Sequence, residues 1–550
     1  MADVPLIDIR PDHWEIVRVI LHAHVPQHEV WAFGSRATWQ AKPYSDLDLA
    51  ILMAEPLPLA LSAALADAFS EAELPWRVDV LDWATTSAAF RAIVQRDKVV
   101  VQQKSMNVKS LWRRYQVSNL INDKVLVIGD GYRAKNSELS TQGLPFARAG
   151  NINNGFNFLD ADRFPAEHIT RIGNKVSQPG DVVFTSKGTV GRFAFVKLET
   201  PTFVYSPQLC FWRSLKHDLV HPKFLYYWML GREFFAQFKS VSGQTDMAEF
   251  VSLTDQRRMY ITLPPLPIQH AIAHILGSLD DKIELNRRMN ETLEAMARAL
   301  FKDWFVEFGP VRAKMEGRQP PDLSAEVAAL FPDALDAEGK PVGWEMESFA
   351  ATINLIGGGT PRTAEPAYWG GEIPWFSVVD IPRDGDVFTI DTEKKITERG
   401  LSESATRLLS PGTSIISARG TVGKCALVGV PMAMNQSCYG VIGKEGRGSY
   451  FTHFSLRYLV TELQQNTHGS VFDTITQATF QTVHVPTIPI PLTQAFDHTV
   501  SSFLQCILAN LHESHTLAAL RDLLLPKLLS GELRVRPPCD SRTTPDENSR

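Results

Sequence analysis

Two aspartates, Asp46 and Asp48, stand one residue apart in the stretch KPYSDLDLAIL, which otherwise has the pattern of a buried β-strand. Burying an unpaired carboxylate is costly, so their position requires a reason. Residues i and i+2 of a strand point to the same face, so both carboxylates project together while Leu47 and Leu49 face a core. Two carboxylates this close repel each other unless a cation lies between them, and hard oxygen ligands favour Mg²⁺ or Mn²⁺. The stretch therefore predicts a metal-binding edge.

The residues around this strand carry a longer pattern. FGSRATWQAKPYSDLDLAIL is followed about thirty residues later by WRVDVLDW. Gly34 and Ser35, the pair Asp46 and Asp48, and a third carboxylate, Asp79, occur in the order typical of the minimal nucleotidyltransferase domains of the polymerase-β superfamily. The first hundred residues resemble that family.

The resemblance implies a catalytic and metal-binding set made of Asp46, Asp48 and Asp79. The first two would hold Mg²⁺ ions that bridge the triphosphate of ATP or another NTP, and Asp79 would complete the site and help to activate the acceptor. The nucleotide-binding residues implied are Gly34, Ser35 and Arg36. Trp39 departs from the pattern, because many relatives carry glycine there, and it would narrow the nucleotide pocket. The alternative is a fold that persists without catalysis, with an antitoxin-like binding role.

The elements that position these carboxylates alternate helix-like and strand-like patterns, which predicts a small α/β unit over residues 1–103. This segment holds 8 basic and 14 acidic residues, whereas residues 104–263 hold 21 basic and 13 acidic ones. Residues 343–492 hold 11 basic and 14 acidic residues. By charge alone, only the segment from 104 to 263 is a candidate for binding a polyanion such as DNA.

Beyond the first unit the sequence repeats itself. GDVVFTSKGTVGRFAFV recurs as PGTSIISARGTVGKCALVG, with the shared Thr189 and Thr421 lying 232 residues apart. Each copy runs through a proline-rich hinge into a long segment of helical period. Such a helix, about 60 Å long at about 1.5 Å per residue, needs a partner helix, and the second copy supplies one. Asn286 and Asn290 interrupt the first apolar stripe and His515 sits near the matching point of the second, which predicts a register-fixing role.

The two-copy region resembles the specificity subunit of type I restriction-modification systems. LNRRMNETLEAMARALFKDWFVEF is similar to the central conserved helix of that family, LAALRDLLLPKLLSGELRV to its C-terminal conserved helix, and VLVIGDGYRAKNSELSTQGLPFARAGNINNG to the opening of its target-recognition domains. The resemblance covers roughly residues 107–535.

The resemblance implies an α/β multidomain fold in which two α/β target-recognition domains are separated by long antiparallel coiled-coil helices. Each domain would read one half of a bipartite site in double-stranded DNA, and the helices would set the spacing and dock modification (methyltransferase) subunits and the restriction subunit. This region would need no cofactor and catalyse nothing. The expected boundaries are 107–264 and 343–491 for the two recognition domains, 265–310 and 492–533 for the two spacer helices, and 534–550 for a disordered tail.

Residues with bidentate or cationic side chains in glycine-permitted loops are the candidates for DNA contact. The alternative for each is a solvated surface charge, and for the neighbouring glycines a simple turn. The candidates are Arg148, Asn151, Asn153, Lys187 and Arg192 in the first copy and Arg383, Arg419 and Lys424 in the second.

The whole chain has scattered cysteines, no secretory signal pattern and no long apolar run, so we expect a cytoplasmic protein with no membrane contact. The leading interpretation is a DNA-specificity subunit with an appended nucleotidyltransferase-like domain. A second is a Mg²⁺-dependent, AMP-transferring, antitoxin-like nucleotidyltransferase with a toxin-like partner, whose C-terminal part only targets it to DNA or to a partner. A third is a fusion of two separately working parts.

Overall fold

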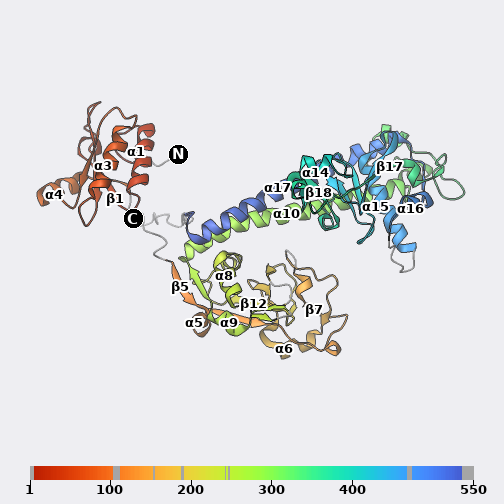
Figure 1. Cartoon of the computed structure of the whole chain (residues 1–550), viewed down its shortest axis with the longest axis horizontal. Helices are drawn as coiled ribbons and strands as arrows, with labels where there is room; N and C mark the ends of the chain where they lie inside the picture. The colour runs from red at the N-terminus through yellow and green to blue at the C-terminus, as the bar shows by residue number, and fades with distance from the viewer. Residues whose placement is uncertain are drawn as a thin grey trace, which may run out of the picture. The chain divides into compact units, whose positions relative to one another are not determined.

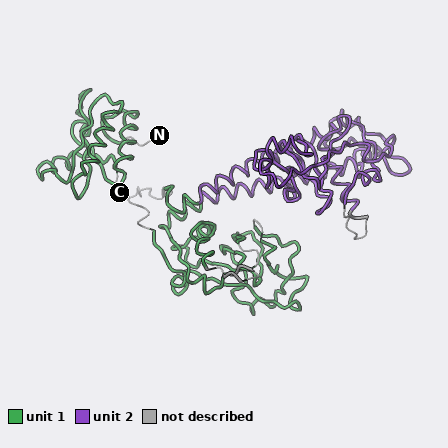
Figure 2. Tube along the Cα trace, in the orientation of Figure 1, with its two compact units in different colours: residues 1–273, 526–550 green, residues 274–525 purple. Residues whose placement is uncertain are grey.

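We analysed a computed structural model of the 550-residue chain. The structure describes residues 5–102, 112–152, 155–187, 191–241, 243–245, 248–466 and 474–535. The chain divides into two compact units, one formed by residues 1–273 and 526–550 and the other by residues 274–525 (Figure 2). Within the described residues, no helix combines the length and the apolar character needed to cross a membrane.

The N-terminal domain is a four-stranded sheet with helices packed on it (Figure 1). The strand order is β3-β2-β1-β4, in which β2 pairs with β1 antiparallel and with β3 parallel. Its core includes Trp14, Val17, Leu47 and Leu49. The elements are α1 (Pro11–His24), β1 (Glu29–Phe33), α2 (Gly34–Ala37), β2 (Leu47–Leu52), α3 (Leu59–Ser70), β3 (Val78–Asp82), α4 (Ala88–Asp97) and β4 (Val99–Gln102).

The first repeated module carries a four-stranded sheet, β10-β9-β12-β6, and a three-stranded sheet, β11-β7-β8. A short antiparallel strand pair, β5 with β15, brings the beginning and the end of this module together. The strands are β5 (Arg113–Gln116), β6 (Leu126–Asp130), β7 (Leu144–Ala147), β8 (Arg163–Phe164), β9 (Val182–Thr185), β10 (Phe193–Phe195), β11 (Val204–Tyr205), β12 (Leu209–Ser214), β13 (Gly243–Thr245), β14 (Ala248–Phe250) and β15 (Tyr260–Leu263). The helices are α5 (Val117–Asn122), α6 (Ile169–Ile172), α7 (Pro222–Met229), α8 (Arg232–Val241) and α9 (Leu253–Arg258).

The second module repeats this architecture, with sheets β17-β24-β21-β22-β19 and β20-β18-β23 and a closing pair, β16-β25. In both modules the smaller sheet contains a parallel pair, β11 with β7 and β23 with β18. The strands are β16 (Met346–Ser348), β17 (Ile353–Gly357), β18 (Trp369–Phe376), β19 (Phe388–Thr389), β20 (Lys395–Ile396), β21 (Ser414–Ser417), β22 (Cys425–Val428), β23 (Ala433–Met434), β24 (Cys438–Gly443) and β25 (His484–Pro486). The helices are α13 (Phe349–Thr352), α14 (Glu398–Ser402), α15 (Ser449–Asn466) and α16 (Gln477–Thr482).

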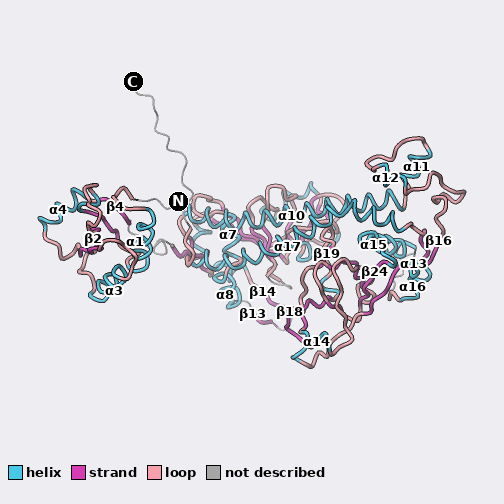
Figure 3. Tube along the Cα trace, turned by 90° about the horizontal axis from the view of Figure 1, so that it is seen from above, coloured by secondary structure: helices cyan, strands magenta, loops and turns pink. Residues whose placement is uncertain are grey.

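Two long helices, α10 (Leu266–Phe305) and α17 (Ile490–Ser530), run side by side (Figure 3). Short helices α11 (Gly309–Met315) and α12 (Ala325–Ala329) follow the first. The pair is antiparallel, because Asp280 contacts Arg521 near one end and the ring of Phe301 lies 5.8 Å from that of Phe496 near the other. The mixed α/β architecture and the antiparallel helices predicted from the sequence are confirmed.

Candidate functional sites

The three carboxylates of the N-terminal domain are positioned by strands β2 and β3. Leu47 and Leu49 are fully buried in the core, while Asp48, between them, is only partly buried on the opposite face. The parallel register places Asp48 directly beside Asp79, and Asp46 is exposed just before β2 begins. The alternation expected from the sequence is therefore present in the structure.

The carboxylate of Asp48 faces the backbone of Gly34. Strand β1 ends at Phe33, which pairs with Asp48, and the chain then turns into α2. Gly34 has φ 75°, and a Cβ atom added there would lie 2.3 Å from Oδ2 of Asp48. Glycine suits this position, because a Cβ atom would displace the Asp48 carboxylate and would require a φ that other residues rarely adopt.

The environment of Asp48 disfavours its charged form. Burial raises the pKa of this carboxyl group, and repulsion from Asp79 and Asp46 raises it further. In the described part of the chain, no group of three or more histidine, cysteine, aspartate or glutamate side chains is arranged to hold a metal ion by itself. Mg²⁺ is commonly held by one or two carboxylates together with substrate phosphates, so these residues fit a metal that arrives with a nucleotide.

The two remaining residues of the predicted nucleotide site differ in exposure. Ser35 is half-buried in α2, next to Gly34. Arg36 is 5% exposed, and its guanidinium donates hydrogen bonds to the carbonyl oxygens of Ser45, at 2.9 Å, and Asp8, at 2.8 Å. It also lies 4.4 Å from the ring centre of Trp76. Arg36 therefore holds the loop before β2 from the inside, a role that its position in the motif gave no sign of.

The glycine-containing turns of the two modules close in the same way. The backbone N–H of Arg192 donates to the hydroxyl of Thr185 at 3.1 Å, and that of Lys424 donates to the hydroxyl of Ser417 at 2.9 Å. Gly191 and Gly423 both have positive φ, 97° and 83°. Residues 188–190 lie outside the described part of the chain, and Lys187 directly precedes them. The shared geometry supports the internal duplication inferred from the sequence.

Three predicted contact residues of the first module lie around one loop. Arg148 forms an ion pair with Asp162 at 2.7 Å, and its backbone N–H donates to the side chain of Asn151 at 2.8 Å. Arg192 donates to the carbonyl of Ala149 at 3.3 Å. Asn153 lies outside the described residues. Arg148, Asn151 and Arg192 are thus brought together, with part of their hydrogen-bonding capacity used within the loop.

In the second module, Arg383 and Lys424 line one cavity of about 220 Å³. A third cation, Arg457 on α15, lines it too and forms an ion pair at 2.9 Å with Glu294 of α10. Sequence reasoning missed Arg457, because nothing in a helical stretch marks which residue faces a cavity. Arg419 is exposed and is not part of this lining.

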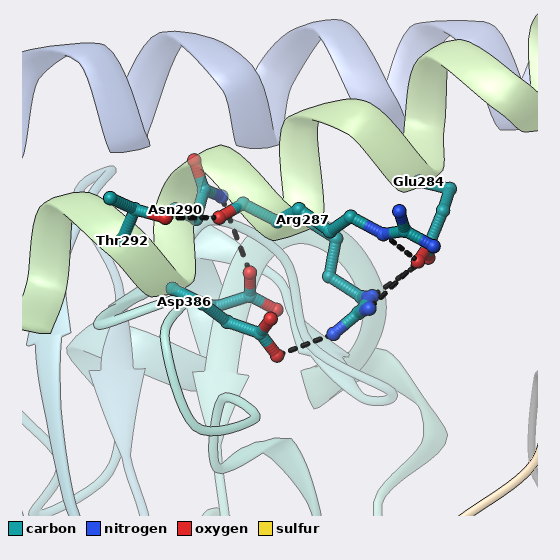
Figure 4. Close-up of polar contacts among 7 residues, drawn as sticks. Glu284, Arg287, Asn290, Thr292 and Asp386 are labelled. Carbon is teal, nitrogen blue, oxygen red and sulfur yellow. Dashed lines mark hydrogen bonds and ion pairs between the residues drawn. The ribbon is translucent and has the colours of Figure 1, made fainter. Parts of the chain in front are cut away.

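The seam of the helix pair contains a polar node next to the second module. The side chain of Asn510 donates to that of Asn290 at 2.9 Å. Asn290 in turn donates to Asp386 of the module at 3.3 Å (Figure 4). Asn286 donates to Glu513 at 2.8 Å. His515, expected near this point, is instead largely exposed and lies 3.6 Å from Asp391.

A charged cluster lies on α10 beside this node. Arg287 binds Glu284 through two hydrogen bonds, of 2.8 and 2.7 Å (Figure 4). Arg288 adds a third, at 2.8 Å, and the pKa of Glu284 falls to about 2. The hydrogen bonds from Arg287 are the main cause of this fall. The cluster keeps this face of the helix charged at neutral pH.

Comparison with known families gives two matches. The family described as "Type I restriction modification DNA specificity domain" matches residues 124–295 and 341–521, more than half of the chain. The family "Polymerase beta, Nucleotidyltransferase" matches residues 18–106.

Two sequence relatives agree with this division. The "Type I restriction enzyme HindI specificity subunit" of Haemophilus influenzae is 26% identical over 437 residues, which cover 70% of this chain and 94% of that protein. The "Probable protein adenylyltransferase MntA" of the same organism is 50% identical over 109 residues, 20% of this chain and 96% of that protein. A crystal structure of a type I restriction-modification S subunit from M. genitalium has a TM-score of 0.45 and 14% identity, and the match covers 78% of this chain and 97% of that one.

Both parts of the sequence prediction are thereby confirmed at the level of family. The chain belongs to the family of type I restriction-modification DNA specificity subunits and carries, over residues 18–106, a nucleotidyltransferase domain of the polymerase-β family.

Proposed function

We propose that the two repeated modules each read one half of a bipartite site in double-stranded DNA, and that α10 and α17 fix the distance between the two halves. The observation that carries this proposal is the duplicated module, with equivalent sheets and turns, joined by antiparallel helices. A rod of fixed length sets the separation of half-sites in the same way as dimer geometry does in other DNA readers.

The cavity lined by Arg383, Lys424 and Arg457 is the proposed backbone-contact site of the second module. The three cations outnumber the one carboxylate in the lining, Asp384, so the hollow suits a phosphate group, which positions the protein on DNA without reading sequence. In the first module Arg192 corresponds to Lys424, and it lies beside Arg148 and Asn151. Lys187 and Asn153 complete the proposed DNA contacts of that module. Arg419, which matches Lys187, would contact DNA from the exposed turn of the second module.

DNA binding by the purified chain tests these assignments. The double variant Arg383→Ala with Lys424→Ala should weaken binding to all sequences alike and reduce the slope of log affinity against log salt by about 2. Arg399→Ala is the matched control, because Arg399 is an exposed cation paired with Glu403 away from the cavity. An unchanged salt slope in the double variant would remove the cavity from the DNA interface.

We propose further that the helix pair docks modification subunits and, through them, the restriction subunit. Leu285, Met289 and Met296 of α10 are 53%, 38% and 45% exposed. Steps of four and seven residues place them on one face of the helix. An apolar stripe of this kind fits an amphipathic helix of a modification subunit.

For the N-terminal domain we propose Mg²⁺-dependent transfer of a nucleotidyl group from ATP or another NTP. Asp46 and Asp48 would hold the metal, which neutralises the triphosphate when bound. The exposed Asp79 would accept the proton of an acceptor hydroxyl while the oxygen of that hydroxyl bonds to the α-phosphorus. The bond between the α-phosphorus and the oxygen that bridges to the β-phosphate would break, and pyrophosphate would leave. Gly34 lets the backbone approach the phosphates, and Ser35 supplies a hydroxyl donor. Arg36 positions the loop before β2.

This second activity is supported by the clustered carboxylates around Asp48 and by the similarity to an adenylyltransferase. The acceptor is a protein, for which a toxin-like partner is our candidate. The test is to incubate the full chain with Mg²⁺, ATP labelled at the α-phosphate and candidate acceptors. Label should appear with the wild-type chain and disappear with Asp46→Asn and Asp48→Asn together. Transfer by the double variant at the wild-type rate would refute the assignment.

A further inference from the structure

The loop between α2 and β2, residues 38–45, carries two exposed aromatic side chains. Trp39 is 64% exposed and Tyr44 is 81% exposed, although most of the aromatic rings in this domain are at least partly buried. Both residues are close to the site along the chain, since Trp39 comes soon after α2 and Tyr44 precedes Asp46 by two residues. Large apolar rings that remain in solvent beside a polar site are available to a ligand.

The Trp39 end of the loop is tied to the nucleotide motif itself. The hydroxyl of Thr38 donates to the carbonyl of Gly34 at 3.0 Å. The backbone N–H of Gln40 donates to the carbonyl of Ser35 at 2.8 Å. Trp39 lies between these two anchors, so its backbone is held beside Gly34 and Ser35.

The Tyr44 end is tied from the interior. Arg36, buried against Trp76, donates to the carbonyl of Ser45 at 2.9 Å. The next residue is Asp46, one of the carboxylates. The backbone beside Tyr44 is therefore fixed just before the metal-binding edge.

Trp39 also adopts a backbone conformation that disfavours it. Its φ is 58°, in the left-handed region where a residue with a Cβ atom is strained and glycine is not. A strained residue persists where the surrounding structure fixes it, and such residues cluster at ligand sites. The turn that ends α2 uses this conformation, through the hydrogen bond from Gln40 to Ser35, but it does not require a tryptophan, so the ring itself needs another explanation.

We propose that Trp39 and Tyr44 form the base subsite of the N-terminal domain, where their rings stack on the purine of a nucleoside triphosphate. The proposal rests on the nucleotidyltransferase function proposed above. With the phosphates at Gly34, Asp46 and Asp48, the base extends beyond the carboxylate edge toward this loop. Stacking on aromatic side chains gives purines, with their larger ring system, an advantage over pyrimidines.

The test is equilibrium binding to the full chain, in Mg²⁺, of three probes: a non-hydrolysable ATP analogue, the matching CTP analogue and inorganic tripolyphosphate. Trp39→Gly should weaken binding of the ATP analogue roughly tenfold to a hundredfold and binding of the CTP analogue less. The same substitution should leave the binding of tripolyphosphate unchanged. Trp39→Phe keeps a ring and should retain most of the affinity. Leu59→Ala, which changes an 88% exposed leucine, is the control. Glycine relieves the strain at position 39, so the variant is expected to fold.

The outcomes separate this inference from the function on which it rests. An ATP-analogue affinity that is unchanged in Trp39→Gly overturns the base subsite, and so does an equal loss for tripolyphosphate. If the wild-type chain binds none of the three probes, the proposed nucleotidyltransferase function fails and the base subsite falls with it. Loss of a protein partner by Trp39→Gly with unchanged nucleotide affinity would assign the rings to protein docking.

Discussion

Asn510 of α17 donates a hydrogen bond of 2.9 Å to Asn290 of α10, and both side chains are buried in the seam between the two helices. Asn290 in turn donates to Asp386, so one side chain joins both helices and the second module. Polar pairs at such positions fix helix register at a cost in stability.

Replacing one member of this pair should destabilise the rod. Asn290→Leu leaves the Asn510 amide and Asp386 without their partner, which should lower the free energy of unfolding by about 1–3 kcal/mol. Asn290→Leu with Asn510→Leu should recover part of this loss, because both polar partners in the seam are then gone. Denaturant unfolding followed by circular dichroism measures both, with the exposed Thr292→Leu as control. A single variant as stable as the wild type would show that this polar contact does not contribute to the free energy of unfolding.

The carboxyl group of Asp48 should make the N-terminal domain sensitive to pH and to Mg²⁺. Its pKa is raised in the folded state, so its favourable contribution is present below the unfolded pKa and is lost as pH rises through the folded pKa. Asp48→Asn should therefore raise the thermal stability of the domain at neutral pH, with little effect in acid. Mg²⁺ should stabilise the wild-type domain more than the variant. Equal Mg²⁺ effects on both proteins would contradict the metal assignment.

His221 should make the first module sensitive to mild acid. Burial is the main cause that lowers its pKa to about 4, and His270, His217 and Lys223 lower it further. Because the folded pKa is depressed, stability is full above about pH 6.5 and declines as pH falls toward 4, by at most about 3 kcal/mol.

The variant His221→Asn isolates this effect. Asparagine keeps the capping acceptor for Phe224 and removes the titration, so stability should vary less between pH 6.5 and 4. Thermal unfolding across this range measures the effect, and the exposed His22→Asn is the control. A pH profile that His221→Asn leaves unchanged would rule out His221 as the titrating group.

The apolar stripe on α10 should decide subunit binding. Changing Leu285, Met289 and Met296 to glutamine should weaken association with a modification subunit roughly tenfold to a hundredfold, since the apolar area available for burial is lost. Folding should be unaffected because all three residues are exposed. Co-purification and sedimentation measure the complex, and full retention of the subunit by the triple variant would exclude the stripe.

Patterns local in sequence were readable before the structure. The alternation around Asp48 placed Leu47 and Leu49 in the core, and the duplicated turns predicted two equivalent modules. The register between two helices far apart in the chain could not be predicted from the sequence. The sequence matched Asn290 with the region of His515, whereas in the structure its partner on α17 is Asn510. The burial of Arg36 and the position of Arg457 in a cavity lining could not be predicted either, because both depend on elements that are distant in the sequence.

The most direct test of the central claim is to map adenine methylation in DNA from cells that express the full chain with its cognate modification subunit. We expect one bipartite motif with a spacer of constant length, and Asp46→Asn with Asp48→Asn should leave it unchanged. Replacing the second module by that of a relative should change one half of the motif only. Methylation without a bipartite motif, or no methylation at all with a folded complex, would contradict the assignment of the two modules as DNA readers.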